Sequence, residues 1–132
     1  MSFLPILLSF LKSSGLIAEN IILIALTSCV LYFLGYKAVG CYRDTSNRAI
    51  MTLEGTDSIL DGNYWTRKDP IAKCAVAAMR KGYNMFAVQN GGWCASSATA
   101  SHTYRKYGPS SACRGDGEGG PGANHVYVLR QC

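Results

Sequence analysis

The sequence has no Cys-x-x-Cys pair and only two histidines, His102 and His125. Structural zinc sites usually combine closely spaced cysteine pairs with further cysteines or histidines. The missing spacing argues against a zinc module, and we expect neither a metal nor another cofactor. Runs of like charge are also missing, which argues against a nucleic-acid groove.

A catalytic set is missing as well. A hydrolase needs a nucleophile paired with a base, or two facing carboxylates, and the sequence shows no Ser-His-Asp pattern. Asp57 and Asp61 flank DSILDG and are typical of turns, so we expect a protein that is not an enzyme. No Asn-x-Ser/Thr acceptor occurs, whereas a glycoprotein O-glycosylated within residues 96–103 stays an open alternative.

Charge is scarce in the first 35 residues, where only Lys12 and Glu19 occur. The net charge of +5 therefore belongs to residues 36–132. We divide the chain into an apolar segment, residues 1–35, and one small cysteine-rich module, residues 36–132. A mildly basic solvated surface is the simplest interpretation of the charge, with attraction to acidic glycans as the alternative.

Residues 1–35 are interpreted as a cleaved signal peptide or a retained apolar anchor. Residues 21–28 have the length of a signal-peptide core, whereas residues 16–35 have about the length of a membrane helix. LTSC at 26–29 matches a lipoprotein cleavage box, but the apolar run continues past it. All three readings predict a secreted or extracellular module. A retained segment would add membrane anchoring or homo-oligomeric assembly.

The cysteines indicate how the module is cross-linked. Its four internal cysteines are Cys41, Cys74, Cys94 and Cys113. In an exported chain they are expected to form disulfides, and three pairings are open. We favour Cys94 as the partner of Cys74. Cys132 is left unpaired or intermolecular if Cys29 is removed with a signal peptide.

The clearest secondary structure is a helix within residues 67–84. Asp69 is a typical N-cap, Pro70 suits the first turn, and Gly82 suits the left-handed position at the end. Strands are expected at 36–44, 85–89 and 125–130. The fold class is therefore α+β: a small disulfide-stabilised module with one helix packed on a short twisted antiparallel sheet, and long loops.

A glycine-rich stretch, residues 111–125, predicts irregular structure. Asp116, Glu118 and Asn124 within it carry oxygens that calcium prefers. Their spacing is not that of an EF-hand loop, so we favour a plain loop.

Four motifs follow one another through the module. They are GCYRD at 40–44, a helix that carries Cys74, GYNMFAVQNGGWC at 82–94, and CRGDGEGG at 113–120 with HVYVL at 125–129. In this order they resemble a WSC domain, the cysteine-rich extracellular module of fungal wall-stress sensors and Kremen-type receptors. The resemblance covers about residues 36–130.

This resemblance implies a non-catalytic extracellular domain that contacts glycans or extracellular proteins. The sequence departs from the family pattern at Ala78 and at Ala95 and Ser96, where the family has further cysteines. Residues 95–112 also form a longer connection than the family usually has. We therefore expect a divergent, cysteine-poor member.

The motif MFAVQNGGWC predicts a sugar site, because indole faces stack on pyranose rings and planar amides bond to hydroxyls. The candidate carbohydrate-binding residues are Trp93, Gln89 and Asn90, assisted by Tyr64, Trp65 or Tyr104. The alternative is that Trp93 packs in the core and Gln89 caps backbone groups. Tyr42, Tyr83 and Tyr127 are assigned to the core.

A second function stays open beside carbohydrate binding. A small disulfide-linked module with a retained apolar segment could be a structural subunit of an extracellular filament, sheath or matrix. The state of residues 1–35 separates the two hypotheses.

Overall fold

A computed structural model describes residues 35–130. The elements in chain order are strand β1 (Tyr36–Arg43), the single-turn 3₁₀ helices η1 (Ser58–Leu60) and η2 (Tyr64–Thr66), helix α3 (Pro70–Arg80), strands β2 (Met85–Gln89) and β3 (Trp93–Ser96), the short helix α4 (Ala100–Thr103), and strand β4 (Ala123–Leu129). The predicted α+β class is confirmed. The predicted signal peptide or anchor and Cys132 lie outside the described residues. Within residues 35–130, no helix has the length and apolar character needed to cross a bilayer.

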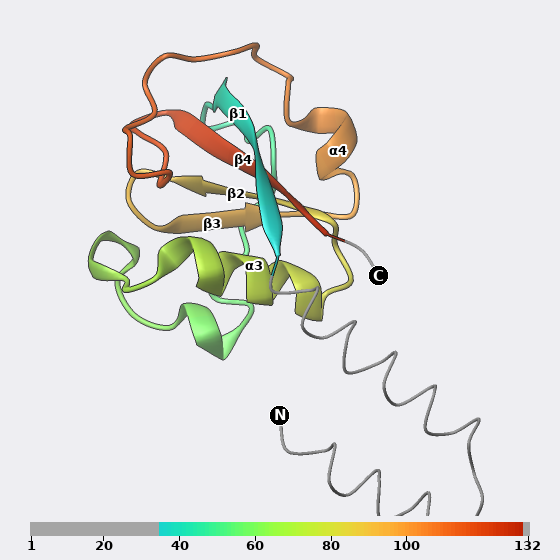
Figure 1. Ribbon diagram of the computed structural model, residues 1–132, viewed down its shortest axis with the longest axis vertical. Coiled ribbons are helices and arrows are strands. Elements are labelled where there is room, and N and C mark those ends of the chain that lie inside the picture. The colour runs from blue at the N-terminus through green and yellow to red at the C-terminus, as the bar shows by residue number, and fades with distance from the viewer. Residues whose placement is uncertain (1–34, 131–132) are drawn as a thin grey trace, which may run out of the picture.

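The four strands form one antiparallel sheet in the order β1-β4-β2-β3 (Figure 1). Strand β4, the last in the chain, lies between β1 and β2 and so joins the two ends of the module. Strand β3 was not predicted. It pairs with β2 as a hairpin, and QNGGWC forms the end of that hairpin.

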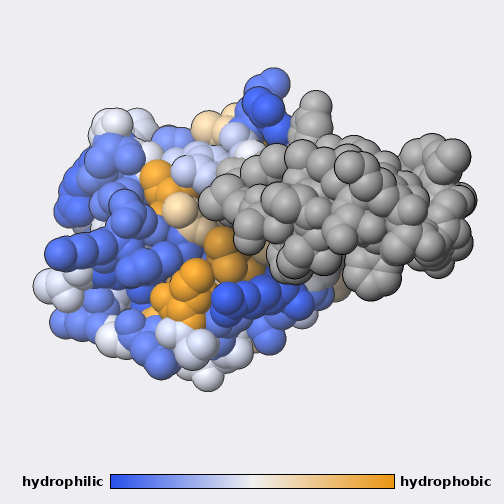
Figure 2. All heavy atoms as spheres, turned by 60° about the horizontal axis from the view of Figure 1, so that its bottom comes forward, coloured by the Kyte–Doolittle hydropathy of each residue, from blue (hydrophilic) through white to orange (hydrophobic). Residues whose placement is uncertain are grey.

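The two faces of the sheet carry separate hydrophobic clusters. Alternate residues of β2 point to opposite faces: Phe86 and Val88 join the cluster that includes α3, whereas Met85 and Ala87 join the one that includes Ala100 of α4. Helix α3 therefore covers one face and α4 packs on the other (Figure 1). Figure 2 turns the lower side of that view forward, and there hydrophobic atoms reach the uncovered surface only in small areas among hydrophilic ones.

Two disulfides link these parts. Cys74 of α3 bonds to Cys94 of β3, the pairing that the sequence favoured, and Cys41 of β1 bonds to Cys113. Each is expected to stabilise the fold by about 2–4 kcal/mol. Disulfides of this kind persist in oxidising compartments.

Helix α3 begins differently from the prediction. Asp69 occupies the N-cap position, but its φ is 50° and its side chain makes no capping hydrogen bond. A left-handed backbone directs the carboxylate away from the first-turn N–H groups, whereas a capping residue normally has extended φ and ψ. The end of the helix agrees with the prediction: Gly82 has φ 75°, and the N–H of Tyr83 donates to the carbonyl of Ala78, as in a Schellman motif.

Gly82→Ala should lower the free energy of unfolding by about 1–2 kcal/mol, because an alanine in the left-handed region is strained. The cost is purely conformational, since a Cβ at Gly82 would meet nothing within 4 Å. Gly115→Ala is the matched control: its surroundings are equally open and its φ is not positive. Urea denaturation with the disulfides intact measures both variants. Equal stability of the two would contradict the Schellman ending.

Asp69→Ala should lose no capping hydrogen bond, because the Asp69 side chain makes none.

Candidate functional site

One row of side chains crosses the face of the sheet on which α4 packs. The strand registers place Tyr42 opposite Asn124, Asn124 opposite Gln89, and Gln89 opposite Trp93. Directly paired residues of antiparallel strands point to the same face. Two amides therefore lie between two aromatic residues, one from each edge strand.

A buried carboxylate, that of Asp44, holds the middle of this row. The Gln89 amide nitrogen donates to Asp44 Oδ2 at 2.7 Å and to Asn124 Oδ1 at 2.9 Å. The backbone N–H of Ala49 donates to Asp44 Oδ1, and Arg48 donates to Oδ2 at 2.8 Å. The Asp44 side chain is fully buried. A carboxylate that is shielded from water needs hydrogen-bond donors from the protein, so this network is a structural requirement of this face of the sheet.

Gln89 was predicted as the last residue of a strand and as a sugar ligand, with capping of backbone groups as the alternative. The structure places it in β2. The residue lies inside the sheet with 7% of its surface exposed. Its amide nitrogen already serves two acceptors, so that group is not free to bind a hydroxyl. The physical reason is Asp44, whose buried charge requires a donor at this point of β2. No pattern local to Gln89 could have revealed a partner 45 residues away.

Trp93 is half-buried and combines the two alternatives left open by the sequence. It packs at the margin of the cluster that contains Met85, Ala87 and Ala100. The guanidinium of Arg48 lies 4.4 Å from the centroid of its ring, held there by Asp44. This cation–π contact covers part of the indole, so Trp93 offers less free face for stacking than the sequence suggested.

The hairpin between β2 and β3 turns at Asn90 and Gly91, both with positive φ, at 52° and 95°. Positive φ at both central residues is the signature of a type I′ turn, for which Asn-Gly is the preferred pair. Gly92 follows, and a Cβ there would overlap the carbonyl oxygen of Tyr64. The turn is therefore in direct contact with η2, which brings Tyr64 and Trp65 to the end of the hairpin.

Tyr64 and Trp65 form an aromatic platform. Their rings stack with centroids 4.8 Å apart and planes inclined by 29°. Trp65 is 58% exposed and is the only exposed aromatic residue among residues 35–130. The side chain of Asn63 accepts a hydrogen bond from the backbone N–H of Trp65 and so holds the turn. This pair is the most accessible part of the predicted site.

Tyr104 follows α4 and lies away from this platform. Its ring packs edge-on against Tyr42 with centroids 4.8 Å apart, and Arg105 lies over its ring. The predicted site residues thus fall into two groups: Gln89, Trp93 and Tyr104 belong to the α4 face, whereas the Tyr64–Trp65 platform lies beside Gly92.

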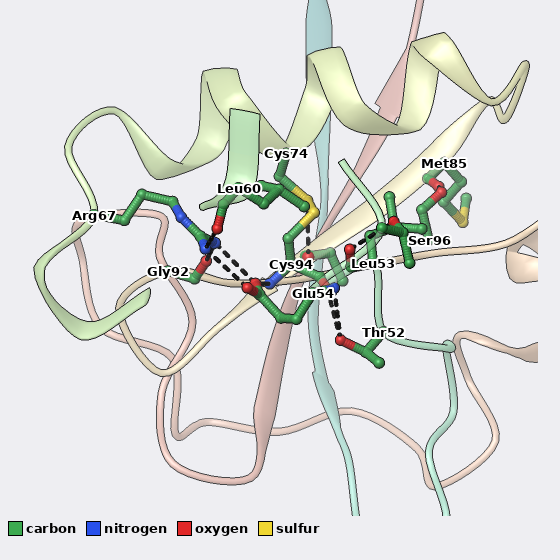
Figure 3. The surroundings of a disulfide bond; sticks show 12 residues. Thr52, Leu53, Glu54, Leu60, Arg67, Cys74, Met85, Gly92, Cys94 and Ser96 are labelled. Carbon is green, nitrogen blue, oxygen red and sulfur yellow. Dashed lines mark hydrogen bonds and ion pairs between the residues drawn. A yellow bond between two sulfur atoms is a disulfide. The ribbon is translucent and has the colours of Figure 1, made fainter. Parts of the chain in front are cut away.

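Arg67, which directly follows η2, forms an ion pair with Glu54 that the sequence did not reveal (Figure 3). This pair holds η2, and with it the platform, in place. Both terminal nitrogens of Arg67 donate to the Glu54 carboxylate at 2.8 Å, and one of them also donates to the carbonyl of Gly92 at 2.7 Å. Glu54 in turn accepts from the backbone N–H of Cys94 at 2.8 Å. The Arg67 side chain is only 2% exposed. Positive and negative residues are interspersed along the sequence, and this pattern gave no sign that Arg67 is buried.

The glycine-rich segment is fastened by Tyr127, whose hydroxyl donates to the carbonyl of Gly117 at 2.6 Å. Burial raises the pKa of Tyr127 to about 12, and the nearby Tyr36, Asp116 and Glu118 add to this. The pKa of the Glu118 carboxyl is also raised, first by partial burial and then by the Asp116 charge.

The acidic and amide residues of the glycine-rich segment do not come together as a metal site. Asn124 lies in the Asp44 network of the sheet rather than with Asp116 and Glu118. Within residues 35–130, no group of three or more His, Cys, Asp and Glu side chains is placed to hold a metal ion. Ser101 Oγ lies 3.5 Å from His102 Nδ1 on the exposed α4, a contact between chain neighbours.

No protein-family model matches this chain, and no curated protein matches it.

Arg67→Met should lower the free energy of unfolding by about 3–5 kcal/mol, because it removes a buried guanidinium and leaves both the Glu54 carboxylate and the Gly92 carbonyl without their donor. Arg80→Met is the control: that guanidinium pairs with Asp57 at 2.8 Å but is 52% exposed, and exposed pairs contribute about 0–1 kcal/mol. Chemical denaturation distinguishes the two. Equal losses would show that the Arg67 pair does not hold the hairpin.

Raising the pH should weaken the fold through Tyr127. An unfolded tyrosine has a pKa of about 10, below the folded value of about 12. The contribution of the neutral phenol is therefore complete below pH of about 10 and is lost as pH rises toward 12. Denaturation midpoints across this range should fall more steeply for the native chain than for Tyr127→Phe. Parallel pH profiles would contradict the assignment.

Proposed function

We propose that this chain is an exported, non-catalytic module of the WSC type that binds carbohydrate through the Tyr64–Trp65 platform. One observation carries the proposal: Trp65 is exposed, and its indole is stacked on Tyr64. A large exposed aromatic ring loses contact with water when a sugar face covers it. Tryptophan and tyrosine are enriched at binding interfaces for this reason.

The rigidity of the platform supports this role. Arg67 follows η2 directly and is buried in its ion pair with Glu54, while Gly92 lies against the carbonyl of Tyr64. Cys94, two residues farther along, is bonded to Cys74. Because the backbone around the rings is fixed on three sides, little conformational entropy is lost when a ligand binds.

The assignment to the WSC type rests on the order of the four motifs in the sequence. In the fold, GCYR lies on β1, Cys74 on α3, the VQ motif on β2, and HVYVL on β4. Export is supported by the two disulfides. On this proposal the protein is secreted or cell-surface attached, and its partners are glycans or glycan-bearing extracellular proteins.

Binding by a single module should be weak, because a platform of two rings covers little of a sugar. Millimolar affinity corresponds to about 4 kcal/mol. Several copies held together on one surface would raise the apparent affinity without any new contact, and a retained apolar segment would hold them in this way.

The alternative function, a structural subunit, is favoured by the outer edge of β1. Within the described chain no strand pairs with this edge between Tyr36 and Gly40, and Lys37, Ala38 and Val39 are exposed. An open edge can add a strand from another molecule. Gly40, where the register of β1 shifts, interrupts the edge and limits the length of such pairing.

Trp65→Ala should abolish binding of neutral glycans while leaving the fold intact, since the removed side chain is mostly solvated. Met51→Ala is the matched control, because Met51 is equally exposed, at 64%, but is not aromatic. The measurement is a glycan array with multivalent display of the full chain, with thermal melts of each variant. We expect signal loss of at least about tenfold for Trp65→Ala only.

Two outcomes would overturn the proposal. Undiminished binding by a folded Trp65→Ala variant would show that the platform is not the site. Absence of any glycan signal for the native chain would leave the structural subunit as the better hypothesis. A sedimentation experiment in which the native chain forms regular assemblies would then support pairing through the outer edge of β1.

A further inference from the structure

A second surface, separate from the Tyr64–Trp65 platform, gathers positive charge on aromatic rings. All three cation–π pairs found within residues 35–130 lie on it. The pairs are Arg48 on Trp93, Arg105 on Tyr104 and Lys106 on Tyr107, with the charged group 4.4, 5.3 and 5.2 Å from the ring centroid. We call these six residues the basic aromatic face.

The loops that carry the basic aromatic face are joined to one another. The hydroxyl of Tyr107 donates to the carbonyl of Asn47, next to Arg48. Tyr42 pairs with Pro109 in an isolated bridge, and the N–H of Arg43 donates to the carbonyl of Gly108 at 2.9 Å. The Cys41–Cys113 disulfide closes the same region. The cations therefore stand on one connected surface.

Acidic residues neutralise only one of the three cations on this face, Arg48, which forms an ion pair with Asp44. Between Asp69 and Asp116 the sequence has no acidic residue at all. The one carboxylate beside Arg48 is Asp44, which is fully buried and already accepts from three donors. It positions the guanidinium, whose side chain remains 37% exposed and keeps further N–H donors for a ligand. Arg105 and Lys106 are exposed, and neither forms an ion pair with a carboxylate among residues 35–130.

We propose that the basic aromatic face binds an acidic polysaccharide, one that carries carboxylate or sulfate groups. Guanidinium and ammonium groups recognise both anions by charge-assisted hydrogen bonds. The basic side chains already lie on aromatic rings, so they lose less conformational entropy on binding than lysine and arginine side chains that are free in solvent. This surface lies apart from the aromatic platform and does not depend on sugar stacking there.

Nucleic acid fits the same face less well. Proteins that bind single strands stack bases on free aromatic faces along a basic groove. Here each of the three rings already has a cation over it, and only three cations are present. Disulfides further indicate an oxidising compartment, where acidic glycans are the common polyanions.

The test compares probes and variants on the full chain, kept soluble in neutral detergent. The probes are heparin, which carries sulfate and carboxylate, polygalacturonate, which carries carboxylate alone, neutral dextran, and a single-stranded DNA oligonucleotide. The double variant Arg105→Gln with Lys106→Gln removes two charges from the face. Lys68→Gln with Lys81→Gln removes two exposed charges beside α3, on the other side of the sheet, and is the matched control.

We expect the native chain to bind at least one of the two acidic polysaccharides and to bind it more weakly as salt is added. The double variant on the face should weaken binding about tenfold, which corresponds to about 1.4 kcal/mol. The matched control should change it less than about twofold. A preference for heparin would assign sulfate, and equal binding of both would assign carboxylate. Trp65→Ala should leave these affinities unchanged, so failure of the platform and failure of this face are distinguishable.

Three results would overturn the proposal. Equal losses in the two double variants would mean that net charge alone attracts the polymer. Dextran binding as tightly as the acidic polymers would remove the role of the anions. Tighter binding of the oligonucleotide than of either polysaccharide would assign the face to nucleic acid.

Discussion

The buried guanidinium of Arg67 is the constraint on which most of the module depends. Residues 44–67 contain only single turns of helix and one isolated bridge, between Thr52 and Ala95 of β3, so backbone hydrogen bonding holds them at few points. Arg67 bonds at once to Glu54, within this stretch, and to Gly92, at the end of the hairpin (Figure 3). A charge this deep tolerates no loss of its partners. The irregular stretch is therefore fixed relative to the sheet.

Asp44 plays the corresponding part on the opposite face. Its carboxylate binds Gln89 in the sheet and Arg48 at the surface, so a buried network continues outward into the cation–π contact with Trp93. The two buried charges thus explain why this small sheet presents two different surfaces. The Arg67 pair supports an exposed aromatic platform, and the Asp44 network supports rings already covered by cations.

Much of the frame was predictable because it depends on local pattern. Pro70 and Gly82 mark the ends of α3 through their own backbone preferences, and apolar spacing places Cys74 on the buried side, facing Cys94. Strand β3 was missed because its four residues, Trp93 to Ser96, are too few to show alternation. The predicted capping role of Asp69 was wrong because its backbone is left-handed. Aspartate tolerates this conformation, but an aspartate in the sequence does not by itself indicate it.

Local sequence patterns are therefore enough to predict the α+β class, the helix and three of the four strands, and they favour one pairing of cysteines. Which polar residues are buried and which aromatic residues remain exposed depends on tertiary contacts. Gln89 and Trp65 show the reason. Burial of Gln89 follows from Asp44, and exposure of Trp65 follows from the packing of η2 on Gly92. Both depend on contacts between residues far apart in the chain, and no window of neighbouring residues contains both partners.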